Sequence, residues 1–218
     1  MTELRNAPAP AGRHADYLAP SEMIDYQHPR VQEFLIADRC GTCDDIATAR
    51  RLFEFVRDSI AHSWDIQSER VTAKASEALE HREGICYAKT HLLAALLRGS
   101  GIPSGICYQR LTLEDTPESG YCVHSLNTVY LESLGRWIRL DARGNKPGVD
   151  AQFSLTEERL AFDVRPELGE CDYLVNYAEP HPLIVETLMR HDDCRIMYST
   201  GLPASLSLSP AMPLATFR

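Results

Sequence analysis

The chain has 218 residues, of which 44% are hydrophobic and 24% are charged, an ordinary composition for a globular protein. Its 31 acidic residues outnumber the 22 basic ones, and the formal charge is −9. This balance argues against a nucleic-acid partner, because binding a polyanion relies on clustered Lys and Arg. No stretch is long and apolar enough to span a bilayer, so no membrane partner is expected.

The first twenty residues, MTELRNAPAPAGRHADYLAP, lack the apolar core of a secretory signal and are rich in Ala and Pro. They predict a loose N-terminal arm. Without an export signal, a reducing cytoplasm is the expected location. Seven scattered cysteines are therefore interpreted as thiols rather than as a disulfide framework.

Helical patterns follow the arm. HPRVQEFLIAD (28–38) predicts a short element, and apolar residues at three- and four-residue steps between Ile46 and Ile60 predict an amphipathic helix. Thr42 and Asp45 have the spacing of a capping pair for that helix. Ser76 is expected to cap a short helix that runs through His81 and is ended by Gly84.

A strongly apolar helix is predicted from about Tyr87 to Arg98, within REGICYAKTHLLAALLRGSGIP (82–103). A helix that is apolar nearly all round lies at the centre of its domain. The period then changes, and three segments rich in Thr, Val, Tyr, Ile and Trp predict strands: 104–114, 120–132 and 135–144. Further on, 155–162 and 181–193 are expected to be helical and 171–180 a strand, with a loop at 145–154 between them and the preceding strands.

Cys86 stands near the first turn of the apolar helix, where unpaired N–H groups and the helix dipole favour a thiolate. Taken alone, it is better explained as a buried structural thiol, because cysteine is among the residues most often buried. His124, in a strand, and Asp141, at the end of the next one, are equally ordinary when taken singly. If the two strands pair as a hairpin with an even-numbered loop, His124 and Asp141 fall on one face as opposite or diagonal neighbours. An aspartate there orients an imidazole for a nearby thiol, which is the logic of a catalytic triad.

The residues and the order of three motifs resemble those of the transglutaminase-like superfamily, whose core is similar to that of papain-type cysteine peptidases. The motifs are Gly84-Ile85-Cys86-Tyr87 before LLAALLRGSGIP, the strand GYCVHSLNTVYL, and WIRLD at 137–141. The resemblance covers roughly residues 49–148. Many members have Trp where Tyr87 stands. No acidic loop with calcium-ligand spacing is seen, so neither a calcium requirement nor any other cofactor or metal is carried over.

The resemblance implies an α+β fold with a papain/transglutaminase-like core, in which N-terminal helices pack on an antiparallel sheet. It places the catalytic Cys at the start of the central helix and brings Cys86, His124 and Asp141 together. We expect a single domain over 1–218, with a core of about 44–150, an N-terminal arm at 1–25 and a C-terminal extension at 150–218.

The implied chemistry is acyl transfer through a thioester, with a peptide, protein or small amide as substrate. The N–H of Cys86 is expected to bind the oxyanion, with Trp64 or His62 as guesses for a second donor. Hydrolysis by a peptidase or amidase is favoured, because the resemblance is to single-domain, bacterial-type members. Transfer to an amine is the alternative, and a non-catalytic binding or scaffold domain of this fold is the alternative of another class.

Other cysteines offer rival sites. Cys40-Gly-Thr-Cys43 could form half of a zinc site or a redox pair, but no second ligand pair of similar spacing is present, so incidental thiols are preferred. Cys122 is two residues from His124 and shares its strand face. A metal site built from Cys86, Cys122 and His124 is therefore the more specific alternative to a catalytic role for Cys86 and His124.

Overall fold

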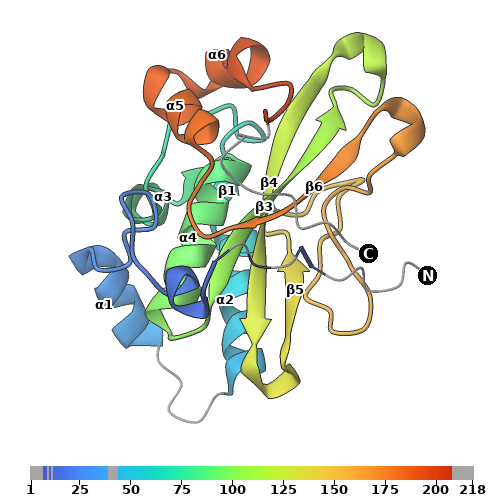
Figure 1. Ribbon diagram of the computed structural model, residues 1–218. Helices are drawn as coiled ribbons and strands as arrows, with labels where there is room; N and C mark the ends of the chain where they lie inside the picture. The colour runs from blue at the N-terminus through green and yellow to red at the C-terminus, as the bar shows by residue number, and fades with distance from the viewer. Residues whose placement is uncertain (1–6, 9, 11, 39–43, 208–218) are drawn as a thin grey trace.

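The structure, a computed structural model, describes residues 7–8, 10, 12–38 and 44–207. Figure 1 shows helices gathered on one side of a long, curled antiparallel sheet. The helices are α1 (Pro29–Asp38), α2 (Asp45–Ser59), α3 (Ala75–His81), α4 (Cys86–Gly99), α5 (Pro182–Arg190) and α6 (Cys194–Ile196). The strands are β1 (Ala61–His62), β2 (Glu83–Gly84), β3 (Ser104–Thr112), β4 (Tyr121–Leu131), β5 (Arg136–Leu140) and β6 (Cys171–Tyr177).

Helix α4 is the centre of the helical layer. Every residue from Cys86 to Arg98 is buried, and the helix packs against β4, α2 and α3. The prediction of a central apolar helix is confirmed, with its start one residue earlier and its end one residue later than expected. No helix in the described part of the chain combines the length and apolarity needed to cross a membrane.

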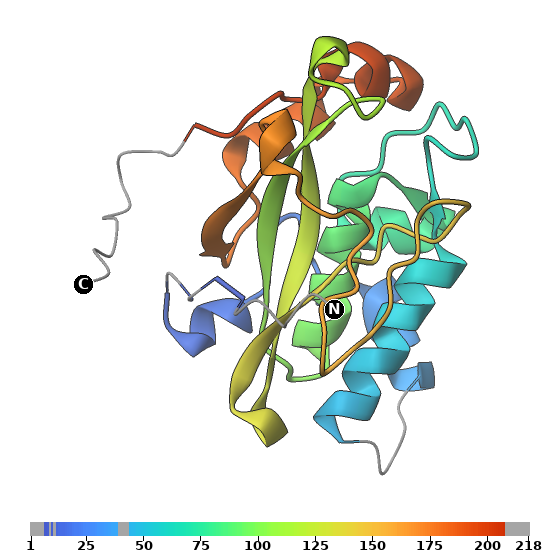
Figure 2. The same cartoon turned by 90° about the vertical axis from the view of Figure 1, so that its right-hand side faces the viewer.

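The main sheet has the order β5-β4-β3-β6, and all of its neighbouring strands are antiparallel. The predicted strands are confirmed. The β4–β5 connection is the four-residue stretch 132–135, an even number, and Asn127 pairs with Leu140. The papain/transglutaminase-like α+β class is therefore confirmed, with helices on one face of an antiparallel sheet (Figure 2).

The helix caps differ from the sequence prediction. Asp44 caps α2 through the N–H of Ala47, and Thr42 lies outside the described residues. Ser76 does not cap α3: it lies inside the helix, where its N–H and hydroxyl both donate to Asp25. The helix then ends at Arg82 in the left-handed region, and not at Gly84. The local pattern misled here because Asp25, 51 residues away in sequence, competes for the serine.

Two further segments also differ. Residues 155–162 form an irregular loop, and not the expected helix, because long-range partners take their backbone groups: Ala161 N–H donates to Asp141. The N-terminal arm is not loose between residues 12 and 25. Tyr17, in the 3₁₀ turn η1 (His14–Tyr17), is fully buried, and its hydroxyl donates to the carbonyl of Asn176. A buried tyrosine with a satisfied hydroxyl fixes this segment to the sheet.

Candidate active site

Cys86 is the first residue of α4, and Ile85 before it makes no side-chain cap. The N–H groups of the first turn are therefore not capped by the preceding side chain. The helix dipole adds a partial positive charge at the same place. Cys86 is only 9% exposed, so the side chain is almost completely buried.

Gly84 lets the chain turn tightly into α4. A Cβ at this position would lie 2.9 Å from both the Cβ of Ala88 and the Oγ1 of Thr72, closer than real contacts allow. The backbone of β2 therefore approaches the first turn of the helix at a distance that only glycine permits. This is the physical reason for a glycine two residues before Cys86.

Side chains of α4 fix the helix against β4. The hydroxyl of Tyr87 donates to the carbonyl of Val123 over 2.7 Å, directly beside His124 in sequence. One turn further on, the carbonyl of Thr90 accepts from the Nδ2 of Asn127 at 3.0 Å. These two bonds set how far the helix start stands from the strand that holds the histidine.

His124 and Asp141 meet as a buried pair. The Nε2 of His124 lies 2.8 Å from the Oδ2 of Asp141, and the two residues are 4% and 1% exposed. Extending the β4–β5 register places Asp141 opposite Leu126, so His124 is its diagonal neighbour. The even loop thus has the geometric effect expected from the sequence.

Asp141 is held by the main chain as well. Its Oδ2 accepts from the N–H of Ala161 at 3.0 Å, and its Oδ1 accepts from the N–H of Arg143 at 3.1 Å. Burial opposes the charged form, but the charge of His124 and these hydrogen bonds outweigh it and lower the pKa of Asp141. The carboxylate is therefore ionised and fixed in direction.

The imidazole of His124 lies between this carboxylate and the thiol. Burial acts to lower the pKa of His124, but the charge and hydrogen bond of Asp141, and a hydrogen bond with Cys86, raise it to about 10. Because Nε2 is engaged by Asp141, Nδ1 is the nitrogen left for the sulfur. The ring of Phe162 packs edge-on against the imidazole, with centroids 5.2 Å apart.

The side of the site next to β1 is formed by His62, Trp64 and Tyr198. His62 pairs with Gly84 in the small parallel sheet, and its ring meets that of Tyr198 edge-on at 5.9 Å. Trp64 stacks on Tyr198 with centroids 4.4 Å apart. Burial and the charge of Arg143 lower the pKa of His62 well below its ordinary value, so this ring is neutral. Its Nδ1 finds no hydrogen-bond partner among the described residues.

Arg143 links the segment after β5 to the segment after β1. Its guanidinium binds both carboxylate oxygens of Asp65, at 2.5 and 2.9 Å, and Lys146 adds a third contact to Asp65 at 2.7 Å. Hydrogen bonds from Arg143 and Lys146 outweigh burial and hold the pKa of Asp65 far below its usual range. Arg143, Phe162 and Tyr198 were not identified from the sequence, since no local pattern marks them.

The structure thus brings together Cys86, His124 and Asp141, with His62 and Trp64 nearby. Cys40 and Cys43 lie outside the described residues. Within the described chain, no three His, Cys, Asp or Glu side chains gather as a metal site, and this includes Cys86, Cys122 and His124.

This geometry defines an α+β protein with a cysteine at a helix start and a histidine–aspartate pair on the sheet. A model of the transglutaminase-like superfamily matches residues 34–142. The match covers half of the chain, so the protein belongs to the transglutaminase-like superfamily. That membership supports a cysteine enzyme family.

A crystal structure of a candidate cysteine protease from Cytophaga hutchinsonii resembles the chain with a TM-score of 0.45 and 20% sequence identity. The likeness covers 65% of this chain and 46% of that one, so the chain spans less than half of that structure's length. Among curated proteins, none matches the sequence.

Proposed function

We propose that the protein is a cysteine enzyme that cleaves amides or peptides through a thioester on Cys86, with His124 and Asp141 completing a catalytic triad. The observation that carries the proposal is the 2.8 Å bond between buried His124 and Asp141, beside a cysteine that opens α4. A raised pKa of His124 keeps the imidazole protonated at neutral pH. A protonated imidazole favours the thiolate form of its neighbour, which is the reactive form.

The reaction has two halves. In the first, the Cys86 thiolate attacks the carbonyl carbon and forms a C–S bond, while the carbonyl electrons move to oxygen. The C–N bond then breaks, and His124 gives its proton to the leaving amine. In the second, water attacks the thioester carbon, His124 takes a proton, and the C–S bond breaks to restore the thiolate and release the acid.

Backbone donors at the start of α4 stabilise the oxyanion. The N–H of Cys86 lies at a helix end without a side-chain cap, where an N–H group has no intrahelical acceptor. As second donor we favour His62 over Trp64, because His62 pairs with Gly84 beside the nucleophile and is neutral, whereas Trp64 is stacked on Tyr198. A neutral ring supplies one N–H without placing a second cation next to His124.

Selective alkylation tests the proposal. The wild-type protein is treated with iodoacetamide between pH 5 and 9, and each thiol is quantified by mass spectrometry. Cys171 is exposed and serves as the internal control for an ordinary thiol. We expect Cys86 to react at least tenfold faster than Cys171 at pH 6, although it is the less accessible of the two. Equal or slower labelling of Cys86 contradicts the proposal and supports a scaffold of the same fold.

Turnover separates hydrolysis from transfer. The wild type and Cys86→Ala are incubated with a library of peptide amides, with and without a primary amine, and products are read by mass. Free acids that depend on Cys86 support hydrolysis. New amides that form only with the amine indicate an acyltransferase, which is the alternative within the same chemistry.

A further inference from the structure

The two sides of the active site come from distant parts of the chain. His62 and Trp64 belong to β1 and the loop after it, whereas Asp141 follows β5. Strand β1 has only two residues, and the N–H of Ser63 after it reaches the carbonyl of Gly84 over 3.3 Å. So short a ladder fixes the strand weakly, and other contacts are needed to hold the loop.

The loop after β1 is closed on itself by main-chain bonds. The carbonyl of His62 accepts from the N–H groups of Asp65 and Ile66, at 2.9 and 3.3 Å. The N–H of Ser68 donates to the carbonyl of Ser63 at 2.9 Å. A contact that fixes Asp65 therefore also fixes His62, because a hydrogen bond joins their backbones.

Arg143 contacts both sides of the active site. Its guanidinium binds the two carboxylate oxygens of Asp65 at 2.5 and 2.9 Å, and its main-chain N–H donates to the Oδ1 of Asp141 at 3.1 Å. The side chain of Arg143 is 4% exposed and that of Asp65 is 27% exposed, so the pair is largely shielded from water. A bidentate pair fixes direction as well as distance, which a single contact does not.

The charge of Arg143 also acts on His62. Burial lowers the pKa of His62, and the charges of Arg143, Lys89 and His124 act in the same direction, whereas Asp65 opposes them. The histidine is 5% exposed, and its Nδ1 finds no hydrogen-bond partner in the described part of the chain. A neutral imidazole held in this way has a ring nitrogen left for a ligand.

We infer that Arg143 is a positioning residue for the oxyanion side of the active site. Through Asp65 it holds the loop after β1, and His62 with it, at a fixed distance from Asp141. The inference rests on the proposed function for the role of His62 as an oxyanion donor, and the hold on the loop is tested independently of it. A misplacement of about 1 Å can reduce a rate roughly 100-fold, so an ion pair outside the reacting atoms is able to control the reaction.

Two variants break the ion pair and keep the rest of the site. Arg143→Met retains the main-chain N–H that binds Asp141, and it leaves at Asp65 a carboxylate that water and Lys146 reach. Asp65→Asn keeps the shape and removes the charge, and it remains available if Arg143→Met does not fold. Arg143→Lys keeps the positive charge without the bidentate geometry.

Fluorescence of Trp64 tests the hold on the loop without any substrate. The chain has two tryptophans, so Trp137→Phe leaves Trp64 as the single emitter. In that background, we expect acrylamide to quench Trp64 at least twofold more efficiently in Arg143→Met and in Asp65→Asn than in the parent. The double variant should match the larger single effect, because both changes break the same pair.

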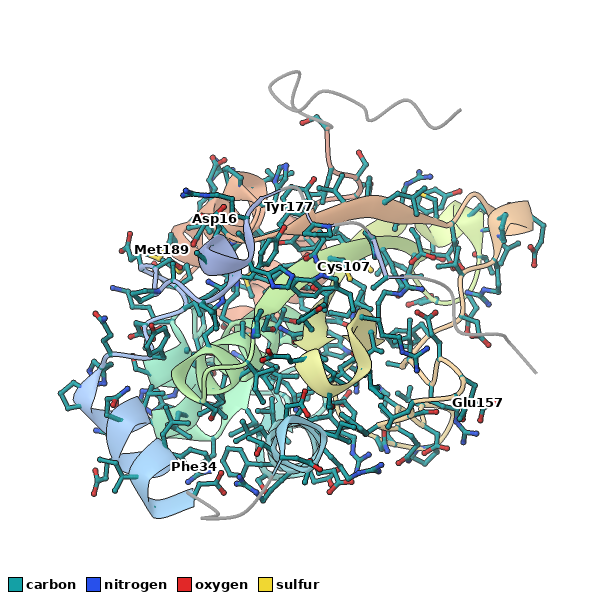
Figure 3. The ribbon with its side chains drawn as sticks, turned by 60° about the horizontal axis from the view of Figure 1, so that its bottom comes forward. Asp16, Phe34, Cys107, Glu157, Tyr177 and Met189 are labelled. Atoms are coloured by element: carbon teal, nitrogen blue, oxygen red, sulfur yellow. The ribbon has the colours of Figure 1, made fainter. Side chains whose placement is uncertain are left out.

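A matched control comes from helix α1. Arg30 pairs with Glu80 at 2.9 Å, and Arg30→Met should leave the quenching unchanged. Figure 3 shows Phe34, on the same helix, at one edge of the molecule and Glu157, on the segment that continues from Arg143, at the opposite edge. Equal effects of Arg30→Met and Arg143→Met would count against a specific hold.

Two rates separate the oxyanion side from the nucleophile. 4-Nitrophenyl acetate acylates a thiolate: the C–S bond forms through an oxyanion, the ester C–O bond breaks, and 4-nitrophenolate leaves. Iodoacetamide alkylates the same thiolate at a tetrahedral carbon with loss of iodide, and no oxyanion forms. We expect Arg143→Met to slow the Cys86-dependent release of nitrophenolate at least tenfold, and to change alkylation of Cys86 less than threefold.

The imidazole of His62 supplies a third reading, by NMR titration with the signal assigned from His62→Gln. In Arg143→Met, we expect the ring to titrate at a higher pH than in the wild type, because a neighbouring cation is gone. Arg143→Lys should restore the wild-type titration, since it keeps that charge.

Three results would overturn the inference. They are unchanged quenching of Trp64 in both Arg143→Met and Asp65→Asn, equal slowing of acylation and alkylation in Arg143→Met, and an unchanged titration of His62 in that variant. Failure of the proposed function has another signature, because wild-type Cys86 is then alkylated slowly and releases no nitrophenolate. The quenching of Trp64 still decides in that case whether Arg143 holds the loop.

Discussion

At the level of single residues, two buried bases near the active site have pKa values that are shifted in opposite directions, although burial acts to lower both. The charge and hydrogen bond of Asp141 outweigh the effect of burial and raise the pKa of His124 to about 10. Lys89 donates to the carbonyls of Arg57 and Ile60, but burial and the charge of Arg143 lower its pKa to about 7. Both shifts link stability to pH, with opposite signs.

The histidine contribution is measurable by urea unfolding of the wild type and His124→Gln between pH 5 and 10. Because the pKa of His124 is raised in the folded state, its ion pair contributes its full stabilisation of the fold below pH of about 6.5, the ordinary pKa of histidine. This contribution is lost as the pH rises toward 10. We expect the stability difference between wild type and His124→Gln to shrink by up to about 1.4 kcal/mol per pH unit across that window. A difference that grows with pH contradicts the ion pair.

The lysine offers a comparison with the opposite sign. Its lowered pKa means that the wild type loses stability as pH falls from about 10.5 to 7. Lys89→Met removes that dependence. In the same urea experiments, we expect the stability of Lys89→Met to decline more steeply than that of the wild type as pH rises from 7 to 10, because only the histidine contribution is left. An unchanged slope contradicts this prediction, because it means that folding does not lower the pKa of Lys89.

The variant Asp141→Asn tests whether the negative charge of Asp141 is needed in addition to its role in orienting His124. The amide keeps the shape but removes the negative charge that raises the pKa of His124. We expect alkylation of Cys86 at pH 6–7 to slow at least tenfold, while Cys171 labels at its wild-type rate. Unchanged labelling of Cys86 means that Asp141 has only a packing role.

At the level of elements, the close approach of β2 to the first turn of α4 positions the nucleophile. Ala88 and Thr72 contact the space where a side chain at residue 84 would lie. The side chain of Thr72 is itself held, since its hydroxyl donates to the carbonyl of Glu83 at 3.1 Å. This contact leaves little room for adjustment, so crowding at residue 84 displaces the helix start.

Gly84→Ala tests this contact. Overpacking of a close-packed site destabilises by about 1–3 kcal/mol, and we expect that loss in urea unfolding together with slower alkylation of Cys86. In the double variant Gly84→Ala/Ala88→Gly, the new methyl group gains room. Its destabilisation should be less than the sum of the two single variants. Strict additivity shows that the two positions do not touch.

At the level of the whole molecule, segments near both ends of the described chain pack aromatic side chains against the core. The N-terminal arm packs on the far side of the sheet, where Tyr17 meets the ring of Trp137 at 5.0 Å. The C-terminal part supplies Tyr198, in the π-helical turn η5 (Met197–Gly201), to the active site. Neither end is an appendage in the physical sense, since each buries aromatic rings against the core.

Tyr17 measures how much the arm contributes. Loss of a fully buried aromatic side chain destabilises by about 3–5 kcal/mol, and loss of one satisfied hydroxyl by about 1 kcal/mol. We expect Tyr17→Ala and Tyr17→Phe to lower the free energy of unfolding by these amounts in urea. A loss below 1 kcal/mol for Tyr17→Ala indicates that the arm detaches in solution.

The sequence predicts the parts of this molecule that depend on local period. The apolar run of α4 and the alternation of β4 and β5 locate Cys86, His124 and Asp141, because helix and strand periods determine which side chains share a face. It does not predict Tyr198 beside Trp64, since that contact joins residues 134 positions apart and no local pattern marks it. It wrongly predicts a helix at 155–162, where a distant carboxylate binds the N–H of Ala161. A long-range partner overrides local propensity at 155–162.

The hydrogen bonds that fix Asp141 determine which substitutions around it the protein can tolerate. Two of its three partners are peptide N–H groups, at positions 143 and 161, and every amino acid except proline provides one. Substitutions at these two positions do not remove the hydrogen bonds to the carboxylate. The orientation of Asp141 therefore depends on the backbone conformation and not on the side chains at 143 and 161. Proline at either position deletes a donor that no neighbouring side chain can replace.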